Sequence, residues 1–214
     1  MAADPLDVLT IDEGKDALQH DVGDSVDNEI LEPYITAVSR MLDREAGAVV
    51  QRDVELERHD GGGHRIHLRV RPVAEITTLV EYQGTSPITL TAEAAGTTSA
   101  NAYLAEPYLP QPGLMSGTVR RRSGGYNRGF WCGGQNVVVT YVAGRYEDTA
   151  GVDARFKRAA SLVLLNLWRD QGPSVNNDGE VVIPFQSFPG FAFPNAAREL
   201  LAEEVGLRAP WGYR

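Results

Sequence analysis

Three of the chain's four histidines lie within fourteen residues, in the stretch ERHDGGGHRIHLRV at positions 57–70. Imidazole nitrogens bind zinc and transfer protons, so this spacing raises the question of a metal or acid–base site. Side chains alternate along a strand, which directs His64 away from His67 and leaves His59 and His64 as the pair that could approach each other. Asp60 adds an oxygen donor in the turn. Two imidazoles without a nearby third ligand make a poor zinc site, so we expect no metal here.

The same stretch has the composition of a β-hairpin. Residues 60–63, Asp-Gly-Gly-Gly, readily adopt the positive φ angles of a tight turn. The flanking segments alternate apolar with polar residues, as strands with one buried face do. Their apolar residues are Val54, Leu56, Ile66, Leu68 and Val70. We therefore predict a hairpin rather than an active site.

No other motif points to catalysis. HDGGGH at 59–64 is similar to the oxyanion loop of esterases, but the chain has no G-x-S-x-G elbow, and GLMSG at 113–117 has its serine in the wrong position. The sequence also contains no phosphate-binding G-x-x-x-x-G-K-[ST] and no G-x-G-x-x-G. The single Cys132 can form neither an intramolecular disulfide nor a cysteine-type zinc site. We predict a protein without enzymatic activity, cofactor or metal.

Basic residues gather at one place in the chain. Arg120, Arg121 and Arg122 are consecutive, and Tyr126 and Trp131 follow shortly after. Arginine and aromatic residues are enriched at contact hot spots, so these residues form a candidate secondary interface for a phosphate backbone or an acidic neighbour. The simpler interpretation is a solvated hairpin tip, with the aromatic rings covering the core beneath them.

Acidic residues concentrate at the N-terminus. Residues 1–48 hold twelve acids and three bases, a net charge of −9, which equals the formal charge of the whole 214-residue chain. The remainder of the chain is therefore neutral. Tight nucleic-acid binding needs clustered Lys or Arg, so this part is unsuited to holding DNA and would suit a surface that DNA slides past. A solvated helix face explains the same composition.

The elements that position these residues begin with helices. Thr10 and Glu13 have the spacing of a capping box, which predicts a short helix over residues 11–19. Apolar residues then recur at helical intervals over residues 27–46, and Gly47 is a suitable end for that helix. This longer helix has one apolar stripe and therefore needs a partner.

The pattern changes period after the second helix. Residues 49–150 consist of short alternating runs broken by Gly, Pro, Ser and Asn, which is typical of a small antiparallel sheet, sandwich or barrel. Helical spacing returns over residues 153–170, with Asp153 as a suitable N-cap, and this helix supplies the missing partner. We predict an α+β chain: a helical pair or bundle, residues 1–48 and 151–171, interrupted by an antiparallel β module.

Residues 172–214 have the composition of a loop, an aromatic segment spaced by prolines, and a last short helix. Asn195 is a candidate N-cap for a helix over residues 196–205. Aromatic residues near a chain end are more often buried against a partner than left in water. We expect residues 172–214 to be a docking segment.

The chain resembles the head-tail connector proteins, also called adaptors or head-completion proteins, of long-tailed double-stranded DNA bacteriophages. The similar segments are, in order, LTIDEGKDALQ, DNEILEPYITAVSRMLDREAG, RPVAEITTLVEYQG, NVVVTYVAGRY, VDARFKRAASLVLLNLWRDQ and FAFPNAARELL. They cover most of the chain, and the resemblance lies in the pattern of elements, without a catalytic signature. The β stretch is larger here than in the compact helical members of the family.

The resemblance implies a structural virion protein of the neck, located between the capsid portal and the tail. Such adaptors join as a homo-oligomeric ring, usually a dodecamer, beneath the portal protein and extend the DNA channel toward the stopper and the tail. Double-stranded DNA would pass through without sequence-specific binding. The candidate residues for docking on the portal or another partner are Phe191, Phe193, Leu200, Leu201, Trp211 and Tyr213. The candidate channel-facing acids are Asp21, Asp24, Asp27 and Glu29.

The sequence also bears on where the protein acts. No apolar run is long enough to span a bilayer, and the first sixteen residues lack the basic start and apolar core of a signal peptide. We expect a protein that stays in the host cytoplasm during assembly, has no membrane partner, and ends in the virion.

Two other interpretations stay open. A neck stopper or tail-completion protein would belong to the same particle, but stoppers are more purely β, so the helical frame favours the adaptor. A soluble β-rich ligand-binding protein or hydrolase would need a pocket with converging polar groups, for example around His59 and His64.

Overall fold

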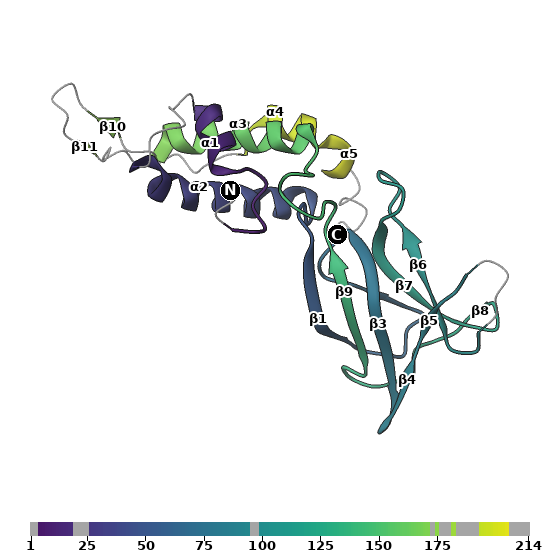
Figure 1. The fold of residues 1–214 in the computed structure, drawn as a ribbon. Coiled ribbons are helices and arrows are strands. Elements are labelled where there is room, and N and C mark those ends of the chain that lie inside the picture. The colour runs from purple at the N-terminus through teal and green to yellow at the C-terminus, as the bar shows by residue number, and fades with distance from the viewer. Residues whose placement is uncertain are drawn as a thin grey trace, which may run out of the picture. The chain divides into compact units, whose positions relative to one another are not determined.

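The chain forms two units, each with its own buried residues. In the computed structural model, residues 1–49 and 148–214 make up a helical unit and residues 50–147 make up a β unit (Figure 1). The structure describes residues 4–18, 26–94, 99–171, 174–175, 181–182 and 193–205, and the statements below concern these residues. The α+β class predicted from the sequence is confirmed.

The helices and strands are each numbered in chain order. The helices are α1 (Ile11–Leu18), α2 (Val26–Ala46), α3 (Ala154–Gln171), α4 (Asn195–Leu200) and α5 (Ala202–Val205). The strands of the β unit are β1 (Arg52–His59), β2 (Arg65–His67), β3 (Val73–Gln83), β4 (Ser86–Thr89), β5 (Thr91–Ala92), β6 (Ala102–Pro107), β7 (Met115–Ser123), β8 (Tyr126–Asn127) and β9 (Val137–Ala143). In the helical unit, β10 (Ser174–Val175) and β11 (Val181–Val182) form a separate antiparallel pair.

Local signals at the helix ends are confirmed. The Thr10 N–H donates to Glu13 Oε2 at 2.9 Å and the Glu13 N–H donates to Thr10 Oγ1 at 3.2 Å, which is the predicted capping box at the start of α1. Gly47 ends α2 with a φ of 87°. Asp153 caps α3 because its Oδ1 accepts the N–H of Arg155 at 2.8 Å.

The two long helices bury apolar stripes in the helical unit. The fully buried residues of α2 are Leu31, Ile35, Val38 and Leu42, at helical spacing. Those of α3 are Phe156, Ala159, Ala160, Val163 and Leu164. The two helices contact each other, and the rings of Tyr34 and Trp168 meet edge to face with centroids 5.2 Å apart. Each large side chain buried in this way contributes about 1.5–3 kcal/mol.

The segment before α1 is tied to α2 and to the loop before α3. The Val8 N–H donates to Ser39 Oγ at 3.0 Å, and Thr36 Oγ1 donates to Asp7 Oδ2 at 3.1 Å. Thr149 Oγ1 donates to the carbonyl of Asp7 at 2.6 Å. Burial raises the pKa of the Asp7 carboxyl, which is only 1% exposed, although its hydrogen bonds act in the opposite direction.

The C-terminal helix differs from its prediction. The helix begins after Pro194, and no side chain caps it, so the prediction of Asn195 as the N-cap is wrong. The predicted single helix over 196–205 is two short helices, because a turn at Leu201 separates α4 from α5. Leu201 is buried, α4 contacts α3, and Arg155 Nη1 pairs with Glu203 Oε2 at 3.2 Å.

The β unit contains one nine-stranded sheet in the order β1-β9-β3-β7-β6-β5, with β4, β2 and β8 beside this path. The sequence predicted an antiparallel module, but the sheet is mixed, because β5 pairs with β6 in parallel. A single residue pair, Val73 with Met115, joins β3 to β7, so the sheet consists of two lobes (Figure 1). Both lobes supply the same core: Leu79 from β3 and Val139 from β9 lie with Ile66 from β2 and Val119 from β7.

Within the described residues, no helix has the length and apolar character that crossing a bilayer requires.

Candidate functional site

The triple glycine does not form the predicted hairpin, because β1 pairs with β9 and β2 pairs with β7 instead of with each other. It lies against a second glycine-rich loop, residues 129–136. The Gly61 N–H donates to Gly133 O and to Asn136 Oδ1, each at 2.9 Å. A Cβ on Gly61 would lie 1.8 Å from the carbonyl oxygen of Trp131, so only glycine permits this approach. The glycines therefore lock two loops together.

The histidines separate as their alternation predicts. His59 Nε2 lies 2.7 Å from Glu57 Oε1, His67 Nδ1 lies 3.1 Å from Thr118 Oγ1, and His64 is exposed. Among the residues that the structure describes, no three His, Cys, Asp or Glu side chains gather as a metal site requires.

Glu57 is the centre of a buried polar cluster in the β unit. Glu57 is 7% exposed, and its carboxylate accepts hydrogen bonds from the hydroxyl of Tyr141 at 2.6 Å and from the N–H of Arg69 at 3.0 Å. A β-bulge between Val54 and Glu57, with Leu56 at a φ of 52°, interrupts the alternation of β1 and buries Glu57. Burial, followed by the hydrogen bond to Glu57, raises the pKa of Tyr141 well above its usual value. Tyr141 therefore keeps its proton and acts as a structural donor.

The arginine cluster does not lie on one surface. Arg121 is fully buried, so its prediction as an interface residue is wrong: its side chain points into the core with Val119, two positions away on β7. Its Nε lies 3.3 Å from Glu81 Oε2, and its Nη2 donates to Asn101 Oδ1 at 3.0 Å. Glu81 Oε1 also accepts the N–H of Trp131 at 2.5 Å. This ion pair connects β3 to β7 across the core.

The neighbouring arginines remain near the surface. Arg120 pairs with Glu106, and Arg122 Nε pairs with Glu93 Oε2 at 2.7 Å. Of the two predicted aromatic contacts, Tyr126 is 79% exposed and Trp131 is 49% exposed. These four residues, Arg120, Arg122, Tyr126 and Trp131, therefore remain candidate interface residues.

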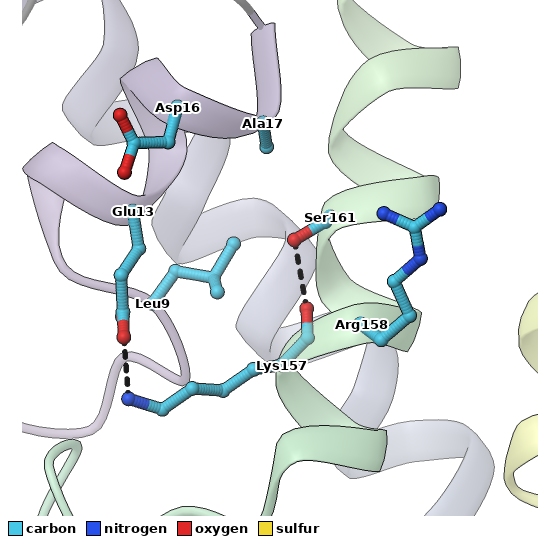
Figure 2. A pocket seen from close by; sticks show the side chains of 7 residues that line it. All are labelled: Leu9, Glu13, Asp16, Ala17, Lys157, Arg158 and Ser161. Carbon is cyan, nitrogen blue, oxygen red and sulfur yellow. Dashed lines mark hydrogen bonds and ion pairs between the residues drawn. The ribbon is translucent and has the colours of Figure 1, made fainter.

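The helical unit contains a hollow of about 350 Å³ between α1 and α3, shown in Figure 2. Its lining residues are Leu9, Glu13, Asp16, Ala17, Lys157, Arg158 and Ser161. Lys157 Nζ donates to Glu13 Oε1 at 2.5 Å, and Ser161 Oγ donates to the carbonyl of Lys157 at 2.9 Å. Burial acts to raise the pKa of Glu13, but hydrogen bonds from Lys157 and Thr10 outweigh it and lower that pKa. The ion pair between Lys157 and Glu13 in this hollow therefore connects α1 to α3.

The predicted docking and channel residues have different positions. Phe193 is 7% exposed and Leu201 is fully buried; the two residues flank α4, whose Ala197 is also buried, whereas Leu200 is 36% exposed. Glu29 is exposed on α2. Phe191, Trp211, Tyr213, Asp21 and Asp24 lie outside the described residues, and Asp27 lies in α2 with a side chain that the structure does not describe.

Sequence reasoning missed the two buried carboxylates of the β unit. Glu81 has the same parity on β3 as the buried Leu79, so strand alternation could have identified it. Glu57 gave no such signal, because the bulge in β1 shifts the alternation just before it.

Comparisons of the sequence with protein families and with curated proteins find no match. The fold, however, is similar to solved structures. A chain in the neck of an empty gene transfer agent particle, computed with C6 symmetry, superposes with a TM-score of 0.57 and 17% identity over 92% of this chain and 89% of that chain.

Two further chains superpose with lower scores. One belongs to the neck of a native gene transfer agent particle computed with C12 symmetry, with a TM-score of 0.48, 18% identity, and coverage of 92% of this chain and 88% of that chain. The other belongs to the virion of the native particle, with a TM-score of 0.47 and the same identity and coverage. The superposition at 0.57 indicates a shared fold, and the two lower scores support no argument.

Proposed function

We propose that this chain is a structural protein of the neck of a phage-like particle. The observation that carries the proposal is the fold similarity to a neck chain of a gene transfer agent particle, because it extends over 92% of this chain and therefore includes both units. The ordered sequence segments that resemble head-tail connector proteins support the same function. Within the neck, we assign the chain to the head-to-tail adaptor, a ring of identical copies beneath the portal.

The charge of the helical unit supports a conduit function. An adaptor ring extends the portal channel toward the stopper and the tail, and double-stranded DNA must pass through it. The first 48 residues carry a net charge of −9, and like charges keep a phosphate backbone from sticking. Asp21, Asp24, Asp27 and Glu29 are the acids that we assign to the channel.

The polar groups of the β unit support binding rather than catalysis. Glu57 and Glu81 are the buried carboxylates there, and each is held by hydrogen bonds to the fold itself. Such groups stabilise a shape and are not aimed at a substrate. We assign portal docking to the C-terminal segment, with Phe191, Trp211 and Tyr213 as its aromatic contacts.

The test is the mass of the purified chain, alone and after mixing with the portal ring of the same particle, measured by light scattering behind a sizing column. The monomer has a mass of 23.3 kDa, so twelve copies would add about 280 kDa to the portal. A stoichiometric ring complex supports the adaptor, and no association at any ratio contradicts it.

The docking residues are better tested by point substitutions than by a truncation. Deleting residues 185–214 would remove α4, whose Ala197 is buried in the helical unit, and would therefore damage the fold. Trp211→Ala combined with Tyr213→Ala removes two aromatic rings outside α4. Tyr82→Ala, which changes an exposed ring of the β unit outside the candidate interface, is the matched control. Loss of portal binding in the double variant but not in the control supports the assignment.

A further inference from the structure

One outer face of the β unit presents arginines in register. Arg65 on β2 lies opposite Arg120 on β7, and Leu104 on β6 lies opposite Arg120 on its other side. Residues paired across neighbouring strands point to the same face of a sheet, and Arg122, two positions along β7, shares that face. We call Arg65, Arg120, Arg122 and Leu104 the arginine face.

The arginine face carries a cation that the β unit does not neutralise. Arg120 is paired with Glu106 and Arg122 with Glu93, so both guanidinium groups are held in place. Arg65 is exposed, and no described carboxylate forms an ion pair with it. Of the two opposed arginines, only Arg120 has a carboxylate partner among the described residues, so Arg65 is the guanidinium of this face that an acidic partner can pair with.

The rest of this face has the composition of a protein contact. Leu104 is 39% exposed. Asn127 on β8 is paired with Arg122 and therefore points to the same face, where its Oδ1 accepts a hydrogen bond from Arg122 Nη1 at 2.9 Å. Arginine is enriched among the residues that dominate binding energies. Because two of the arginines are already held by carboxylates, less side-chain freedom would be lost on binding.

We propose that the arginine face binds the acidic helical unit of a second copy of this chain. The helical unit contains twenty acids and ten bases, a net charge of −10, whereas the β unit contains nine acids and ten bases, a net charge of +1. The two units are therefore complementary between copies, and repeating the contact from copy to copy builds a ring. This inference rests on the proposed ring-forming function and names the surface that closes the ring.

A second copy fits this face better than DNA does. Phosphate binding requires clustered positive charge, but Arg120 and Arg122 are already neutralised by carboxylates on the same unit. The exposed Leu104 adds apolar area to the face, and a phosphate backbone gains little from apolar area.

The experiment compares ring formation on the portal for the full chain and three variants, by light scattering at low and high salt. Arg65→Glu reverses the unpaired charge, and Arg65→Gln only removes it. Arg58→Glu, an exposed residue of β1 in the same unit, is the control with the same charge change. We expect Arg65→Glu to require at least about tenfold more protein for half-maximal ring assembly, Arg65→Gln to be intermediate, and Arg58→Glu to match the unsubstituted chain.

The other outcomes separate this inference from the proposed function. If the unsubstituted chain forms rings and Arg65→Glu forms them equally well, the inference is overturned and the adaptor function stands. If the unsubstituted chain never forms a ring, both are overturned. Fluorescence anisotropy with a short DNA duplex covers the remaining case: a loss of duplex binding in Arg65→Glu with ring assembly intact would identify a nucleic-acid surface and overturn the inference.

Discussion

Replacing Glu81 by glutamine should destabilise the β unit more than any surface change. Glu81 and Arg121 have side chains 2% and 0% exposed, so the ion pair between β3 and β7 is shielded from water. Removing one partner of a buried pair costs about 3–5 kcal/mol, because the other charge stays buried without compensation. Arg121 would keep its hydrogen bonds to Asn101 and to nearby carbonyl groups, which places the expected loss for Glu81→Gln toward the lower end.

The assay is urea unfolding followed by hydrogen exchange of the β3 and β7 peptides, which reports on the β unit alone. A lower midpoint with an unchanged slope would show a loss of stability rather than a change in the unfolded state. Glu75→Gln, an exposed residue of the same strand, is the control and should change the free energy of unfolding by less than about 0.5 kcal/mol. A loss below about 1 kcal/mol for Glu81→Gln would refute the reasoning, because it would mean that water reaches the guanidinium.

Three further predictions concern both units. Gly61→Ala should cost about 1–3 kcal/mol, because its Cβ would lie 1.8 Å from Trp131 O, whereas Gly134→Ala, with its nearest atom at 3.8 Å, should be tolerated in the same thermal-unfolding measurement. Asp7 has a raised pKa in the folded state, so its contribution to stability is present below the pKa of the unfolded chain and is lost as the pH rises through the folded pKa. Asp7→Asn should abolish that part of the pH dependence in urea titrations, and an unchanged pH profile would contradict the assignment. Thr10→Ala should cost about 0.5–2 kcal/mol through loss of the cap, and should be visible as faster hydrogen exchange in α1.

The sequence predicted the features that depend on near neighbours. The capping box of Thr10 and Glu13, the cap at Asp153 and the helix end at Gly47 are each decided within a few residues, and all three are confirmed. The prediction of Asn195 as a cap is wrong although asparagine is a suitable cap residue, because the helix begins one residue earlier, directly after Pro194.

Features that depend on distant partners were harder to predict. The glycines at 61–63 have turn composition, but their use depends on the loop at 129–136, which approaches only in the folded sheet. Arg121 is one of three consecutive arginines, and composition alone does not distinguish it from its neighbours. Strand parity does: Arg121 follows the buried Val119 by two positions, whereas Arg120 and Arg122 point outward. The alternation of side chains along the strand therefore predicts which arginine is buried better than the clustering of charge does.

The buried ion pair has a second consequence, for the register between the two lobes of the sheet. Val73 with Met115 is the one backbone pair between β3 and β7, so backbone hydrogen bonding alone constrains their register weakly. Glu81 and Arg121 meet in one register only, since a shift by one residue would turn either side chain out of the core. Replacing both by apolar residues, Glu81→Leu with Arg121→Met, removes two buried charges together and should cost less stability than Glu81→Gln alone. We expect this double variant to stay folded but to show heterogeneous hydrogen exchange in β7; uniform protection equal to that of the unsubstituted chain would mean that apolar packing alone sets the register.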